Sequence, residues 1–125
     1  MSYESKIFIT APNGGDCAEE IARLDLSRMG RETVNGEAFK DVFKRPLDED
    51  FFIGDADREP TKEDKYGDPL KWATVDETLA WLDAAFAASE DLREYRRARL
   101  LYGVLQTLKA DEETWGLLRV IHYGR

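Results

Sequence analysis

Both ends of the chain carry short apolar runs that are typical of β-strands. Residues 3–10 alternate between two sets of side chains, and their Ile-Phe-Ile centre predicts a strand with both faces at least partly covered. Residues 117–123, LLRVIHY, are rich in β-branched and aromatic side chains and favour a second strand. A helix is the alternative for this run, because Trp115, Leu118 and His122 also fit helical spacing. If both runs are strands, we expect them to pair and form a small sheet.

A helix is expected over residues 17–29. Asp16 can cap its first N–H groups, and Glu19 stands where a capping box needs a glutamate. Gly30 fits a stop at the C-terminal end of this helix. The buried stripe would consist of small and apolar side chains at helical spacing, namely Cys17, Ile21, Leu24 and Leu26 or Met29.

Two further helices are expected in the second half of the chain. Thr74 caps the first, with Glu77 at the matching position of a capping box. Its apolar stripe is Val75, Leu79, Leu82 and Phe86. Ser89 caps the second, which should cover about 90–108. The apolar side of this helix includes Leu92, Tyr95, Leu101, Leu105 and Leu108. Because almost nothing separates the two helices, they should form an antiparallel hairpin.

The middle of the chain has weaker patterns. In residues 31–45, Asn35-Gly36 favours a hairpin turn, but a short helix over 37–44 stays open because Phe39, Val42 and Phe43 are spaced like one helical turn. Residues 46–69 hold three of the four prolines and few periodic apolar positions. We therefore expect a long, acidic, irregular connection there, of a kind that is often functional or mobile.

The expected architecture is a single α+β domain over residues 1–125. Its small sheet pairs the N-terminal strand with the C-terminal strand, and about three α-helices cover it, including the antiparallel helical hairpin. A chain of 125 residues with 42% hydrophobic side chains can bury a core. Cys17 is the single cysteine, so an internal disulfide is excluded, which suits a reducing compartment. With no signal-peptide pattern and no apolar run near the ~20 residues of a membrane span, we expect a cytoplasmic protein.

Negative charge is concentrated in residues 48–68, which we call the acidic segment. It carries nine acidic side chains against three basic ones, a net charge of −6, whereas the whole chain carries −8. Such a segment repels nucleic acid and attracts basic protein surfaces. The residues expected to meet a partner are carboxylates and two phenylalanines of this segment: Asp48, Glu49, Asp50, Phe51, Phe52, Asp55, Asp57, Glu59, Glu63 and Asp64.

No catalytic, cofactor or metal site is predicted. Asp55-Ala56-Asp57 resembles the start of a calcium loop, but Pro60 replaces the required glycine and Tyr66 the bidentate carboxylate. His122 is the single histidine, and with Cys17 alone it cannot complete a zinc site. Since no spacing selects one carboxylate pair over the rest, we expect a protein that is not an enzyme.

One basic cluster offers an alternative site. Arg93, Arg96 and Arg97 would share a face of the expected helix over 90–108, with Arg99 close to Arg96. Such a face can hold a small anion, for example a nucleotide signal. The overall charge of −8 argues against direct binding of nucleic acid.

Short blocks along most of the chain resemble a family of small acidic accessory proteins encoded by phages and prophages of gut bacteria. The blocks are Tyr3-Glu4-Ser5, Ile21-Ala22-Arg23-Leu24-Asp25, Tyr66-Gly67-Asp68-Pro69-Leu70-Lys71, Trp81-Leu82 and Ile121-His122-Tyr123-Gly124. None of them carries known chemistry, so no catalytic residue is transferred. The resemblance implies a protein of the bacterial host's cytoplasm that binds and blocks a host protein, such as a nucleic-acid-binding nuclease of a defence system.

Two functions follow from the sequence. The first is a stoichiometric, anti-CRISPR-like inhibitor whose acidic segment stands in for nucleic-acid phosphates in a basic groove. The alternative is an anti-defence protein that sequesters a nucleotide signal through the arginine cluster.

Overall fold

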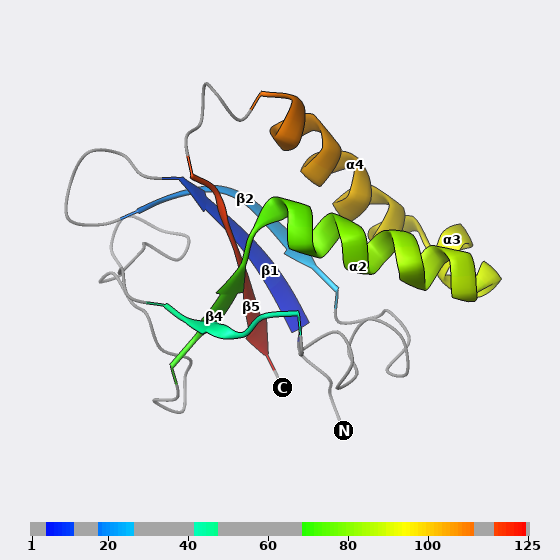
Figure 1. Cartoon of the computed structure of the whole chain (residues 1–125), viewed down its shortest axis with the longest axis horizontal. Helices are drawn as coiled ribbons and strands as arrows, with labels where there is room; N and C mark the ends of the chain where they lie inside the picture. The colour runs from blue at the N-terminus through cyan, green and yellow to red at the C-terminus, as the bar shows by residue number, and fades with distance from the viewer. Residues whose placement is uncertain (1–4, 12–17, 27–41, 48–68, 112–116, 125) are drawn as a thin grey trace.

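The protein is an α+β structure built on one antiparallel sheet, which confirms the fold class expected from the sequence. The computed structural model describes residues 5–11, 18–26, 42–47, 69–111 and 117–124. Its strands are β1 (Ser5–Ala11), β2 (Glu19–Asp25), β3 (Arg45–Pro46), β4 (Lys71–Ala73) and β5 (Arg119–Gly124). Its helices are α2 (Val75–Ala88), α3 (Glu90–Glu94) and α4 (Arg96–Ala110). The sheet has the strand order β2-β1-β5-β4-β3 (Figure 1).

The first and last strands, β1 and β5, pair in the middle of the sheet. β1 pairs with β5 from Ser5↔Gly124 to Thr10↔Arg119, in the pairing that the sequence suggested. Because successive side chains of a strand point to opposite faces, the Ile-Phe-Ile run of β1 serves both faces. Ile7 and Ile9 belong to the larger core cluster, and Phe8 belongs to the smaller one.

The helix predicted over residues 17–29 is wrong in its described part, because residues 19–25 form strand β2. The register shifts between Ile9, which faces Ala22, and Thr10, which faces Glu20. Ile21 is therefore an extra residue in β2, as in a β-bulge. The bulge lets the consecutive residues Ile21 and Ala22 both pack against the larger core. Because of the bulge, the apolar residues of this strand are spaced in the sequence as they would be on one side of a helix. This spacing explains why a helix was predicted here.

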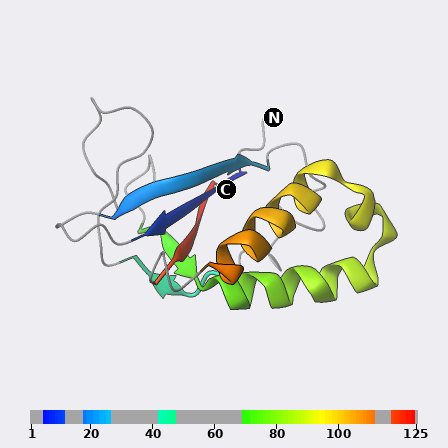
Figure 2. The ribbon, with the colours of Figure 1, turned by 90° about the horizontal axis from the view of Figure 1, so that it is seen from above.

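The helical layer covers one face of the sheet, with α2 and α4 antiparallel (Figure 2). The N-terminus of α2 carries the capping box that the sequence predicted at Thr74 and Glu77, so this prediction is confirmed. The single helix predicted over 90–108 is instead divided into α3 and α4. Tyr95 lies between them with φ −78° and ψ 119°, an extended conformation. Its ring packs partly buried against the larger core, so packing overrides the local helical preference.

Two clusters of buried apolar side chains pack against the two faces of the sheet. The larger cluster lies between the sheet and the helices and includes Leu82, Leu101 and Leu105, all fully buried. The smaller cluster lies on the other face of the sheet. It consists of Phe8, Ala18, Leu47, Leu70 and Ile121, with Trp72 and Tyr123 packed against it. In the part of the chain that the structure describes, no helix has the length and apolar character needed to cross a membrane.

The neighbouring residues Leu117 and Leu118 offer a matched test of this core. Leu118 is 4% exposed and Leu117 is 57% exposed. Leu118→Ala should lower the free energy of unfolding by about 2–5 kcal/mol, because it leaves a cavity in the larger core. Leu117→Ala should change it by no more than about 0.5 kcal/mol, as for other exposed positions. Urea denaturation followed by circular dichroism measures both, and equal losses would contradict the assigned core.

Candidate functional site

The two flanks of the acidic segment meet at the edge of the sheet. The segment itself, with every residue expected to meet a partner, lies outside the described residues, but Leu47 before it and Leu70 after it are described. The N–H of Leu47 donates a hydrogen bond to the carbonyl of Leu70 at 2.8 Å. Both leucines are buried in the smaller core cluster. The described residues that flank the acidic segment therefore lie side by side, at a place that we call the root of the segment.

Strands β3 and β4 extend the root into the sheet. Arg45 faces Trp72, and Pro46 faces Lys71, directly before the bond between Leu47 and Leu70. β3 has only two residues and lies at one end of the strand order, so its ladder alone gives little stability. Side-chain contacts must hold it against the rest of the protein.

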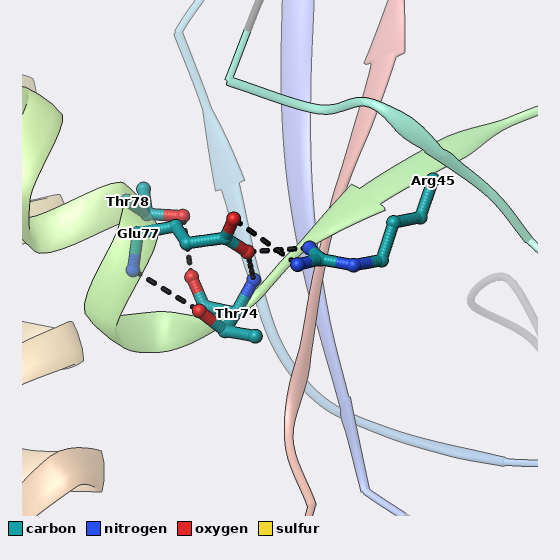
Figure 3. A network of polar contacts seen from close by, with 4 residues as sticks. All are labelled: Arg45, Thr74, Glu77 and Thr78. Atoms are coloured by element: carbon teal, nitrogen blue, oxygen red, sulfur yellow. Dashed lines mark hydrogen bonds and ion pairs between the residues drawn. The ribbon is translucent and has the colours of Figure 1, made fainter.

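The ion pair of Arg45 with Glu77 supplies such a contact (Figure 3). The guanidinium binds both carboxylate oxygens, Nη1 to Oε1 and Nη2 to Oε2, the latter at 3.2 Å. Paired N–H donors of this kind match a carboxylate in geometry as well as in charge. Glu77 lies in the first turn of α2, so the pair ties the root of the acidic segment to the start of a helix.

The capping box of α2 fixes the position of Glu77. The N–H of Thr74 donates to Oε1 of Glu77 at 3.0 Å, and the N–H of Glu77 donates to Oγ1 of Thr74 at 3.1 Å. Oγ1 of Thr78 donates in turn to the carbonyl of Thr74 at 2.9 Å (Figure 3). The hydrogen bond from Arg45 and then the backbone N–H of Thr74 lower the pKa of Glu77 from 4.5 to about 2. Glu77 therefore stays ionised at neutral and mildly acidic pH.

Trp72 adds an aromatic contact beside the root. The guanidinium carbon of Arg45 lies 5.0 Å from the centre of its ring, and that of Arg119 lies 4.6 Å from it. These distances are in the range of cation–π attraction. On the same face, Arg23 lies 5.0 Å from the ring centre of Phe8. The face of the sheet away from the helices thus combines aromatic rings with arginines.

The four arginines of the alternative site do not lie on one helix. Arg93 is on α3, whereas Arg96, Arg97 and Arg99 are on α4, beyond the break at Tyr95. Nη1 of Arg97 donates to the carbonyl of Asp25 at 2.8 Å and lies 3.6 Å from its carboxylate. Arg97 is therefore engaged in holding α4 to β2, and the other three side chains are exposed.

The described residues also include the single histidine of the sequence and a groove between two helices. His122 stacks on Phe43, with ring centres 5.5 Å apart. No group of three potential metal ligands occurs within the described ranges. Cys17 and the calcium-like stretch 55–59 lie outside these ranges. A groove of about 620 Å³ lies between α2 and α4, and its polar lining includes two pairs in contact, Asp83 with Tyr102 and Asp76 with Lys109.

Sequence reasoning missed the residues that build the root. Arg45 stands in a stretch whose pattern was ambiguous, and its partner Glu77 lies 32 positions away. Trp72 and Arg119 also come from separate strands. The capping box was the single available signal, because it placed Glu77 at the start of a helix.

No family model, curated protein or solved structure matches this chain.

The pKa of Glu77 gives a pH-dependent prediction. In the unfolded chain this carboxyl has its usual pKa of 4.5, and in the folded protein about 2. Its contribution to the free energy of unfolding is therefore complete above pH 4.5 and is lost as pH falls toward 2. Glu77→Gln keeps a side chain that suits the capping box. The difference in free energy of unfolding between wild type and this variant should shrink as pH falls from 5 to 2.

Arg45→Gln provides the control for this experiment. Without the guanidinium, the largest cause of the lowered pKa is gone. Adding Glu77→Gln to Arg45→Gln should then change the pH dependence much less than it does in the wild-type background. If wild type and Glu77→Gln lose stability in parallel over this pH range, the ion pair does not form in solution.

Proposed function

We propose that this protein is a non-catalytic binding protein whose acidic segment engages a basic surface of another protein. The observation that carries the proposal is a net charge of −6 in residues 48–68, joined to a root whose two flanks are held together. In keeping with the resemblance of its sequence blocks, we further propose that it is a phage or prophage accessory protein. Its target would be a host protein such as a defence nuclease. It would inhibit this target by occupying the groove that binds nucleic acid.

The distribution of charge supports this proposal. The described residues carry eleven lysines and arginines and ten aspartates and glutamates, a net charge of +1. The negative field of the molecule therefore comes mainly from the acidic segment. A localised field of one sign steers an oppositely charged partner to one place and accelerates association.

The mechanism we propose is substitution for phosphate. A groove that binds nucleic acid presents lysines and arginines to the backbone, and its affinity falls steeply with salt. Carboxylates of the acidic segment can pair with the same side chains, and Phe51 and Phe52 can add apolar contacts of the kind that dominate interface energies. The contact between Leu47 and Leu70 keeps the two flanks of the segment together, and closing a loop in advance lowers the entropy cost of binding.

The alternative function, binding of a nucleotide signal by the arginine cluster, has weaker support. The break at Tyr95 separates Arg93 from the other arginines, and Arg97 already contacts Asp25. A thermal-shift screen with linear and cyclic nucleotides tests it, since a ligand that binds the folded state raises the melting temperature.

Neutralisation of the acidic segment tests the main proposal. The partner is first captured from the native host by immobilised wild-type protein and then purified for binding measurements. Asp55→Asn, Asp57→Asn and Glu59→Gln combined should lower the association rate roughly tenfold at low salt, because electrostatic steering is lost. The salt dependence of affinity should also become weaker. Stopped-flow fluorescence over a series of salt concentrations measures both quantities.

A triple variant with substitutions outside the acidic segment is the matched control. Glu19→Gln, Glu90→Gln and Glu94→Gln change the net charge by the same amount at exposed positions on β2 and α3. This control should associate nearly as fast as wild type. If it loses as much as the variant of the acidic segment, net charge alone determines binding and the proposed site is wrong.

A further inference from the structure

The outer face of α4 is exposed along its middle. We define this face by Leu100, Gly103 and Thr107, which follow one another at helical spacing. Leu100 is 55% exposed, one of two large apolar side chains so exposed among the described residues. A methyl group added at Gly103 would meet no atom within 4 Å. The buried residues Leu101 and Leu105 point to the core instead.

Among the residues that the structure describes, no atom outside the helix's own backbone lies close to the open side of Gly103. Glycine in a helix interior is less favourable than alanine, and the open space around Gly103 would accept a larger side chain. Thr107 donates a hydrogen bond from Oγ1 to the carbonyl of Gly103 at 2.9 Å, which any residue at position 103 would allow. What glycine adds is room for another backbone to approach closely.

The charges in the first turn of α4 oppose its dipole. Arg96 and Arg97 lie in its first turn, no acidic residue does, and Tyr95 provides no side-chain cap. Asp111 stands at the C-terminal cap. Cations are favoured at the C-terminus of a helix and anions at its N-terminus, so Arg96 and Arg97 stand at the less favourable end, whereas at the other end Lys109 in the last turn offsets Asp111. The contact of Arg97 with Asp25 offsets the unfavourable position of its charge. For Arg96, no such contact is seen among the described residues.

We propose that a second copy of this chain packs its α4 antiparallel against this face, with Gly103 at the crossing point. Arg96 precedes Gly103 by seven residues and Asp111 follows it by eight. At 1.5 Å per residue, these side chains lie about 10 and about 12 Å from the centre, on opposite sides. An antiparallel arrangement therefore brings Arg96 of one copy to Asp111 of the other, twice in a two-fold dimer. It also sets the two helix dipoles in opposition, which is favourable.

The dimer is independent of the proposed function. Its surface is α4, whereas the acidic segment joins β3 to β4, so either idea can fail without the other. With a single exposed leucine from each copy at its centre, the interface should be small and the association weak and reversible. Sedimentation velocity from about 5 µM to about 500 µM covers dissociation constants in the micromolar range.

Charge exchange is the decisive test of this interface. Arg96→Glu and Asp111→Arg should each raise the dissociation constant of the dimer about tenfold or more, because each substitution replaces two attractive pairs with repulsive ones. The double variant Arg96→Glu/Asp111→Arg should restore dimerisation. Lys109→Glu is the control, because Lys109 faces Asp76 on α2 rather than the outer face of α4, and it should leave the dissociation constant unchanged. Circular dichroism verifies that each variant folds.

Gly103→Ala tests the same interface through packing. In dilute monomer it should raise the melting temperature, because alanine favours helix and meets no clash. In the dimer it should raise the dissociation constant, because the methyl group separates the two helices. A wild-type protein that stays monomeric over this range, a double charge variant that fails to dimerise, or a Gly103→Ala protein that dimerises like wild type would each overturn the proposal.

Discussion

The hydrogen bond between Leu47 and Leu70, supported by the ion pair of Arg45 with Glu77, is the constraint on which the functional account depends. It brings together two positions that are separated by the whole acidic segment. The strand that carries Arg45 has two residues, so its place at the sheet edge depends on side chains as much as on its ladder. Burial of both leucines and the paired contacts of Arg45 fix the root to the sheet and to α2.

Most of the negative charge of the chain lies outside the described core and its sheet. The residues that the structure describes carry a net charge of only +1, and a well-buried core holds their sheet and helices together. Most of the net charge, −6 of −8, belongs to the acidic segment that connects the neighbouring strands β3 and β4. A protein that recognises a partner electrostatically gains from this division, because the charged segment can vary in sequence while the core continues to specify the fold. Two of the described arginines have a structural role. Arg45 connects β3 to α2, and Arg97 connects α4 to β2.

The sequence predicted those parts of the fold that depend on local chemistry. The capping box at Thr74 and Glu77 and the apolar runs at both ends of the chain are local signals, and the structure contains the corresponding helix and strands. The prediction failed where distant contacts decide. The extra residue Ile21 gives strand β2 a helical spacing, and packing of Tyr95 against the core interrupts a helix that local preference would continue. Likewise, composition located the acidic segment, but no local pattern could show that Arg45 finds Glu77.

Amide hydrogen exchange at Leu47 tests the central claim most directly. If the N–H of Leu47 is bonded to the carbonyl of Leu70, its exchange should be slower than in an unstructured peptide by about tenfold or more. Arg45→Gln should accelerate that exchange while the amides of central strand β1 change little. Exchange of the Leu47 amide at the rate of an unstructured peptide in the wild-type protein would contradict the claim that the two flanks of the acidic segment are held together.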